Sequence, residues 1–133
     1  MLTYTDINTE LKSRLPEIVT EAQHIHGCYG DPRVKTEVFY FSAFNKILMQ
    51  LLEVSLPDEE LLWRMFRFME EMAQSKDADV RQLLQITILE KLWDDTATLR
   101  RAERRMFPYT RRVSDNILGY YASPAARRAR QFD

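Results

Sequence analysis

Turn residues are scarce in this chain, whose 133 residues include only three glycines and five prolines. A protein of many short strands needs turn residues at short intervals, so this scarcity argues against such a fold. The apolar residues instead recur at spacings of three and four, as they do along one face of an α-helix; Ile7, Leu11 and Leu15 begin the pattern. The sequence therefore predicts long helices.

Capping residues and prolines predict where these helices begin and end. Pro16 should kink or restart the first helix, and the CYGDP sequence at 28–32 is typical of a turn. Ser55 or Asp58 can cap the helix that follows Pro57. The predicted helical ranges are about 7–27, 34–54, 58–75, 77–93 and 96–106, with a last helix that starts near Pro108 and includes Tyr121.

Short connections between these helices predict that sequential neighbours pack antiparallel. We expect an all-α fold of five to seven helices in antiparallel pairs, either a HEAT-like right-handed stack or an irregular bundle. The helix over 77–93 is apolar on more than one face, so it should lie between neighbouring helices. We expect one domain over 1–133, in which residues 119–133 are partly frayed because they lack a sustained apolar period.

The N-terminal sequence, the lengths of the apolar runs and the cysteine content indicate the cellular compartment. The N-terminal sequence MLTYTDINTE has acids where a secretory signal has basic residues, and no apolar run approaches the roughly 20 residues that span a bilayer. Cys28 is the only cysteine and cannot form an internal disulfide, which agrees with a reducing environment. We expect a cytoplasmic protein that makes no membrane contact.

Charge is divided unevenly along the chain. Residues 1–99 contain 10 Lys or Arg against 17 Asp or Glu, whereas residues 100–133 contain 9 against 3. The stretch LRRAERRMFPYTRR at 99–112 holds six arginines, and helical spacing places the first four opposite the apolar side chains of Leu99, Ala102 and Met106. The predicted basic face consists of Arg100, Arg101, Arg104, Arg105, Arg111 and Arg112.

This basic face has two interpretations. It could neutralise phosphates while rings such as Phe107 and Tyr109 stack on bases. Alternatively it is a solvated helix face whose arginines partly pair with acids of the preceding helices, which is the usual role of charged residues on amphipathic helices. We favour the second interpretation because the acidic remainder of the chain would repel a polyanion, so nucleic acid is the less favoured partner.

Acidic residues gather at the predicted helix ends, and a stack of antiparallel helices would bring alternate ends onto common edges. Carboxylates at helix N-termini complement the helix dipole, which explains many of them. They could also steer and hold a cationic protein, because opposite potentials raise association rates. The predicted partner-binding residues are Asp58, Glu59, Glu60, Asp77, Asp79, Asp94 and Asp95.

Two other groups could carry chemistry. The HIHGC segment at 24–28 supplies three possible metal ligands, but it lacks a paired ligand motif, so we expect no metal and no cofactor. Glu70, Glu71 and Glu90 could act as acid–base residues, yet no nearby histidine, metal motif or glycine-rich loop supports that chemistry. Solvated helix charges or an interhelical hydrogen bond are the favoured roles for these glutamates, and we do not expect an enzyme.

Four segments carry a family resemblance: LPEI at 15–18, FRFMEEM at 66–72, TILEKLW at 87–93 and MFPYTRR at 106–112. Together they resemble a family of small, all-helical, HEAT-like bacterial proteins that includes predicted immunity proteins of toxin systems, among them contact-dependent inhibition. The likeness spans about residues 10–121 and consists of helix-core patterns.

The resemblance implies an immunity protein that binds a cognate toxin domain, often a nuclease, and neutralises it by stoichiometric inhibition. A nuclease presents cations to bind phosphate, so the acidic helix ends could compete for that surface. The basic face could then contact a second patch of the toxin or another copy of the chain. A helical adaptor that binds a peptide or helix of another protein remains the alternative.

Overall fold

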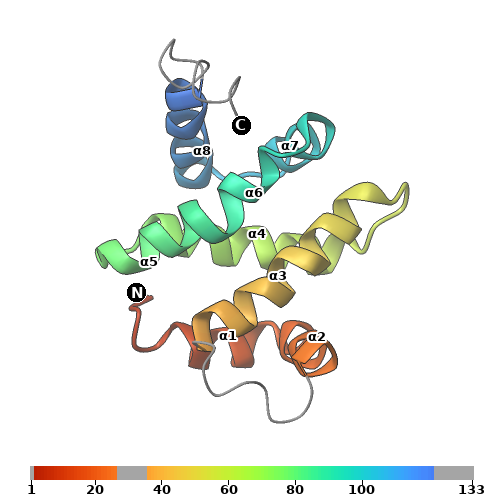
Figure 1. Ribbon diagram of the computed structural model, residues 1–133, viewed down its shortest axis with the longest axis vertical. Coiled ribbons are helices and arrows are strands. Elements are labelled where there is room, and N and C mark those ends of the chain that lie inside the picture. The colour runs from red at the N-terminus through yellow and green to blue at the C-terminus, as the bar shows by residue number, and fades with distance from the viewer. Residues whose placement is uncertain (1, 27–35, 122–133) are drawn as a thin grey trace.

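The computed structural model describes residues 2–26 and 36–121, and within these ranges it contains helices and no strand. The elements are α1 (Ile7–Arg14), α2 (Pro16–His26), α3 (Thr36–Glu53), α4 (Glu59–Ala73), α5 (Ala78–Leu83), the π-helix η1 (Leu84–Leu89), α6 (Glu90–Leu92), α7 (Thr96–Glu103) and α8 (Pro108–Tyr121). Because α5, η1 and α6 follow one another without a break, the described chain forms seven helical segments (Figure 1). The all-α prediction is confirmed.

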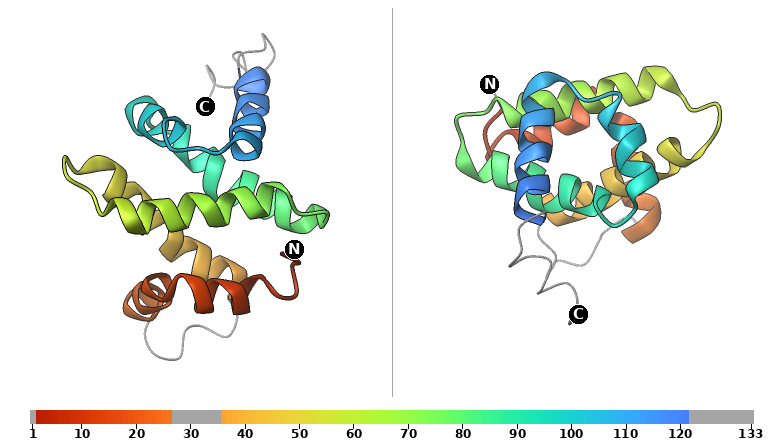
Figure 2. Two further views of the ribbon diagram at one scale, coloured as in Figure 1. Left: turned by 180° about the vertical axis from the view of Figure 1, so that it is seen from behind. Right: turned by 90° about the horizontal axis from the view of Figure 1, so that it is seen from above.

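The helices cross one another as an irregular bundle, one of the two predicted arrangements. In Figure 1, α1 lies across the view while α2, which follows it directly, is seen nearly end-on. Figure 2 shows α4 across the middle of the molecule, with α1 and α2 on one side and α7 and α8 on the other. Helix α3 contacts α1, α2, α4, α7 and η1, and therefore joins the two halves of the bundle.

A continuous apolar core runs through the described residues and includes side chains from each of the seven helical segments. It extends from Leu2 and Ile7 near the N-terminus to Ile117 of α8. The single domain over 1–133 stays a prediction, because residues 122–133 lie outside the described part. Residues 119–121, the first of the segment predicted to be partly frayed, belong to α8. No described helix is long and apolar enough to cross a membrane.

Pro16 restarts the helix, as predicted. Helix α1 ends at Arg14, and α2 begins at Pro16, where a missing backbone N–H does no harm. The Ile18 N–H bonds the Leu15 carbonyl at 3.0 Å instead of continuing the α-helical ladder to Arg14. The Arg14 carbonyl is thereby left for a partner from another helix.

The continuous α-helix predicted over 77–93 is corrected by the structure, which widens into a π-helix between Leu84 and Leu89. The Thr87 hydroxyl bonds the Leu83 carbonyl, and the Asn45 amide of α3 donates to the Thr87 carbonyl. Helix η1 contacts α3, α4 and α8, so the prediction that this helix lies between neighbours is confirmed. Of the large apolar side chains of η1, Leu84, Ile88 and Leu89 are buried and Ile86 is exposed.

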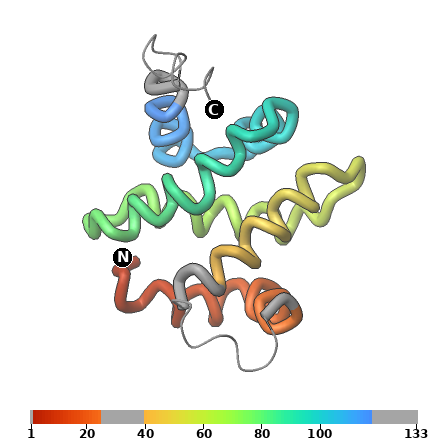
Figure 3. Tube along the Cα trace, in the orientation of Figure 1, coloured from red at the N-terminus to blue at the C-terminus, as the bar shows by residue number. Residues whose placement is uncertain are grey.

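The N-terminal segment is fastened to the turn between α4 and α5. The Ser75 hydroxyl donates to the Leu2 carbonyl at 2.6 Å, and the Tyr4 N–H donates to Asp77 at 2.8 Å. Figure 3 shows the N-terminal end of the trace beside this turn. These two hydrogen bonds, each between residues 73 positions apart, hold the N-terminal segment against the bundle.

Candidate protein-binding surface

Three of the predicted partner-binding acids cap helices. The Asp58 carboxylate accepts from the Leu61 N–H at 3.1 Å at the start of α4. At the start of α5, Asp77 accepts from the Asp79 N–H at 3.0 Å. Asp95 accepts from the N–H groups of Ala97 and Thr98 at 3.0 and 3.3 Å at the start of α7. The geometry thus gives these three acids a capping role, in line with the expectation that carboxylates at helix N-termini complement the helix dipole.

Backbone hydrogen bonds shift the pKa of two of these carboxyls. The hydrogen bond from the Tyr4 backbone N–H is the largest cause that lowers the pKa of Asp77. The hydrogen bond from the Thr98 backbone N–H does the same for Asp95. Both shifts favour the ionised form, because an N–H donor stabilises a carboxylate more than a neutral carboxyl.

The seven predicted acids do not form one surface. Asp58, Glu59 and Glu60 lie at the start of α4, whereas Asp77 and Asp79 follow its end. The 15 residues of α4 separate these groups by about 22 Å at 1.5 Å per residue (Figure 1). The exposed Asp94 and Asp95 form a third group before α7.

The basic face is partly tied to the rest of the molecule, as the favoured interpretation predicted. The Arg105 guanidinium donates to both carboxylate oxygens of Glu59, at 2.7 and 3.2 Å, and this hydrogen bonding lowers the pKa of Glu59. Arg101 donates to the Leu52 carbonyl at 3.2 Å, and so supplies a cation to the C-terminal end of α3, whose last turn has no basic residue.

The other predicted arginines differ in their surroundings. Arg111 pairs with Asp115 at 3.1 Å and with Glu103 at 3.3 Å. The Arg112 guanidinium lies over the Tyr109 ring, 5.2 Å from its centroid. Arg100 is exposed on α7, and Arg104 is exposed at the C-cap position directly after it. The six arginines are therefore a mixed surface of paired and solvated cations.

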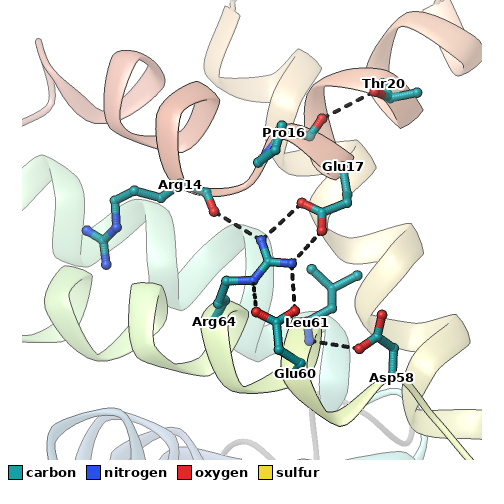
Figure 4. Close-up of polar contacts among 8 residues, drawn as sticks. All are labelled: Arg14, Pro16, Glu17, Thr20, Asp58, Glu60, Leu61 and Arg64. Carbon is teal, nitrogen blue, oxygen red and sulfur yellow. Dashed lines mark hydrogen bonds and ion pairs between the residues drawn. The ribbon is translucent and has the colours of Figure 1, made fainter.

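Glu60 takes part in an ion-pair cluster around Arg64, which Figure 4 shows at the junction of α1 and α2. The Arg64 guanidinium donates to Glu60 at 2.7 and 2.9 Å, to Glu17 at 3.1 Å, and to the free Arg14 carbonyl at 3.2 Å. The hydrogen bond from Arg64 lowers the pKa of Glu17, and the two carboxylates raise that of Arg64. This cluster fastens α4 to the restart at Pro16.

Glu70 holds the start of α8 from inside the bundle. Its side chain is only 3% exposed and accepts from the N–H groups of Tyr109 and Thr110 at 3.0 and 2.8 Å and from the Thr110 hydroxyl at 2.9 Å. Helix α8 has no acid in its own first turn, so α4 supplies the cap. Of the two roles predicted for these glutamates, Glu70 therefore has the interhelical hydrogen bond. Glu71 pairs with Arg14, and Glu90 is half-buried.

Trp63 is the apolar residue of α4 that the core does not enclose. It is 58% exposed, although its neighbours Leu62 and Phe66 are buried. A hollow of about 270 Å³ on one side is lined by these two residues together with Phe107, Glu59 and Arg105. We call this exposed indole, with the hollows on either side of it, the Trp63 face.

A second hollow, of about 520 Å³, lies on the other side of the indole and is lined by Arg14, Arg64, Arg67 and Glu71. The Arg67 guanidinium lies over the Phe107 ring, 5.8 Å from its centroid, and so joins the two hollows. The Trp63 face therefore combines an apolar hollow with a charged one.

Sequence reasoning missed this face, although the signal was present. Leu62, Met65 and Phe66 have the spacing of one apolar helix face, and this phase puts Trp63 and Arg67 together on the outward side. The hollow beside the indole could not be predicted, because Phe107 reaches it from the connection between α7 and α8.

The HIHGC segment lies largely outside the described side chains, apart from His24, which is exposed. In residues 2–26 and 36–121, no three His, Cys, Asp or Glu side chains are grouped as they would be to hold a metal ion.

Comparison with known proteins gives one match. A family model described as a domain of unknown function (DUF7674) matches residues 8–122, which extend from α1 to the end of α8. No curated protein and no solved structure matches the chain.

Proposed function

The chain belongs to the family of the domain of unknown function DUF7674, and from that premise we propose that it is an immunity protein, a stoichiometric inhibitor that neutralises a bacterial toxin domain by docking on it through the Trp63 face. A nuclease is the toxin class that the sequence resemblance favours. Inhibition of this kind needs a complementary surface and no chemistry of its own. It would take place in the cytoplasm, where a nuclease meets its substrate.

The exposed indole of Trp63 is the observation that carries this proposal. Tryptophan and arginine are the residue types most enriched among those that dominate protein–protein binding energies. Trp63 is surrounded by guanidiniums, and Arg14, Arg64 and Arg67 line the hollow beside it. A partner that covered the indole would remove a large apolar side chain from water within a charged rim, which is the usual anatomy of an interface.

Rigidity also supports the proposal. Helix α4 is held on its inner side by buried Leu62, Met65, Phe66 and Met69, and Arg64 ties its first half to α1 and α2. Little conformational entropy is lost when a surface this well fixed binds a partner, because its backbone is already ordered. An inhibitor gains affinity from such preorganisation.

A helical adaptor would use the same face to bind a protein that is not a toxin. The identity of the protein partner therefore distinguishes an adaptor from an immunity protein.

Nucleic acid is a weaker candidate for binding at this surface. The carboxylates of Glu59, Glu60 and Glu71 lie among its guanidiniums and would repel successive phosphates.

The test is co-expression with a candidate toxin domain taken from the neighbouring gene, where this proposal expects one, scored by survival of the host cells. We expect Trp63→Ala to lose protection and to weaken binding to the purified toxin domain by at least about tenfold, as expected for a central interface tryptophan. Ile86→Ala is the matched control, since Ile86 is also a large exposed apolar residue (48%) but lies on η1. Folding of both variants is checked by circular dichroism.

Two results would contradict the proposal. If the wild-type chain neither protects cells nor binds the toxin domain, it is not the inhibitor of that toxin. If a folded Trp63→Ala variant protects as well as wild type does, the Trp63 face is not the inhibitory surface.

A further inference from the structure

Arg67 differs from the other guanidiniums around Trp63. Arg14 pairs with Glu71, Arg64 with Glu17 and Glu60, and Arg105 with Glu59. Among the described residues, Arg67 has no carboxylate partner, and its guanidinium lies over the Phe107 ring. The face thus has a single cation whose charge no residue of the described chain balances at close range.

The contact with Phe107 leaves this cation available for one kind of ligand. An aromatic ring attracts a guanidinium through its π-face and does not neutralise its charge as a carboxylate would. Two N–H groups of a guanidinium match the two oxygens of a carboxylate, which gives a bidentate, charge-assisted pair. The ring contact also restricts the side chain before binding, so less conformational entropy is lost when the pair forms.

The hollow beside Arg67 favours an apolar neighbour for that carboxylate. Its walls include Leu62, Trp63, Phe66 and Phe107, with the Glu59–Arg105 pair as the charged part. Its volume of about 270 Å³ is below the roughly 300–1,000 Å³ of pockets that enclose small-molecule ligands, and it suits one bulky side chain better.

We propose that the Trp63 face recognises a protein segment in which an aspartate or glutamate lies beside a large apolar residue. The carboxylate binds Arg67 and the apolar side chain enters the hollow between Trp63 and Phe107. This inference rests on the proposed function, because it takes the Trp63 face as the docking surface. It reverses the sign of the contact expected from the sequence, since Arg67 selects an anionic group whereas the acidic helix ends would select cations.

The experiment is selection of a phage-displayed random peptide library on the immobilised full-length chain. Selected peptides should carry Asp or Glu next to Leu, Phe or Trp. A synthetic peptide of the selected sequence is then titrated by fluorescence polarisation. Arg67→Gln should weaken its binding by about ten- to a hundredfold, the range for loss of a hydrogen bond to a charged group. Arg67→Lys should weaken peptide binding less, because lysine keeps the positive charge but cannot donate two parallel N–H hydrogen bonds to one carboxylate.

Two controls connect the loss to the proposed pair. Arg100→Gln removes an exposed arginine of α7 and should leave peptide binding unchanged. Changing the peptide's acid to its amide should weaken binding to wild type as much as Arg67→Gln does, and should add little further loss to the Arg67→Gln variant, because the two changes remove the same interaction.

Several results would overturn the inference: no selected peptide, selection of basic peptides, or equal binding by wild type and Arg67→Gln. Binding of a random-sequence single-stranded RNA that Arg67→Gln abolishes, without any peptide binding, would assign the cation to nucleic acid and also overturn it. The proposed inhibitor function is judged separately by Trp63→Ala. If Trp63→Ala loses protection while Arg67→Gln binds peptide normally, the docking face stands and the carboxylate specificity fails.

Discussion

Trp63 and Glu70 lie on the same helix, and each occupies the side of α4 that its polarity does not favour. Glu70 is 3% exposed and Trp63 is 58% exposed. The burial of Glu70 is explained within the chain, because three donors at the start of α8 replace the water that it loses. No described contact explains the exposure of Trp63 in the same way. The internal partners of Glu70 therefore identify it as a structural residue. Trp63 has no such internal explanation, and this difference is why we propose an external partner for Trp63.

The largest expected difference separates Trp63 from its neighbour Phe66, which is 1% exposed. Phe66→Ala should lower the free energy of unfolding by about 3–5 kcal/mol, because it leaves a cavity in the core. Trp63→Ala should change it by less than about 1 kcal/mol, since more than half of the indole is already in water. Urea unfolding of both variants measures this. A loss of several kcal/mol in Trp63→Ala would make the indole a structural residue and remove the contrast.

The next largest effect concerns Glu70. Glu70→Ala leaves the N–H groups of Tyr109 and Thr110 and the Thr110 hydroxyl without their acceptor, at a cost of about 2–4 kcal/mol in the free energy of unfolding. Glu70→Gln should cost less, because the amide keeps one acceptor oxygen in the same shape.

Hydrogen exchange locates the effect of Glu70→Ala. Amides of α8 should exchange faster in this variant, while those of α3, which Glu70 does not cap, should follow only the change in global stability. If Glu70→Ala unfolds at the wild-type urea concentration, the buried cap does not stabilise α8 and the explanation of its burial is wrong.

The helices could be predicted from the sequence because their signals are local. Apolar spacing, N-cap acids and prolines act within one or two turns, so the start at Pro108 was predicted correctly. The restart at Pro16 and the cap at Asp58 were each one of two predicted alternatives. The π-helix could not be predicted in this way, because the Thr87 carbonyl within it accepts a hydrogen bond from Asn45, which lies 42 residues away in the sequence. Local propensity carries no information about such a contact.

The candidate site was predicted less well, for the same physical reason. Asp77 and Asp95 were correctly expected at helix ends, but whether such an acid caps its own helix or faces a partner depends on geometry. The outward position of Trp63 followed from helical phase and was overlooked. The hollow beside it depends on Phe107 and Arg105, which lie about 40 residues further along the chain.

A smaller effect is expected from the caps, and it depends on pH. The pKa of Asp95 is lowered in the folded chain, so its stabilising contribution is complete above the unfolded value of about 3.9 and is lost as the pH falls through the lower folded value. Asp95→Asn keeps a capping oxygen but does not titrate. The difference in unfolding free energy between wild type and Asp95→Asn should therefore narrow between about pH 5 and about pH 2. A difference that stays constant over this range would show that the carboxylate charge contributes nothing.

The smallest effect is expected from Glu59, whose pair with Arg105 is exposed on the carboxylate side. Pairs of this kind contribute little to stability because water and salt screen them, so Glu59→Gln should unfold at nearly the wild-type urea concentration. Glu59→Gln therefore tests, without a loss of stability, whether the acids predicted to bind a partner act by steering it. If carboxylates at the start of α4 steer a cationic partner, its association rate should fall and should become less sensitive to salt. If docking depends on the apolar contact of Trp63, Glu59→Gln should change the association rate less than about threefold, while Trp63→Ala mainly speeds dissociation.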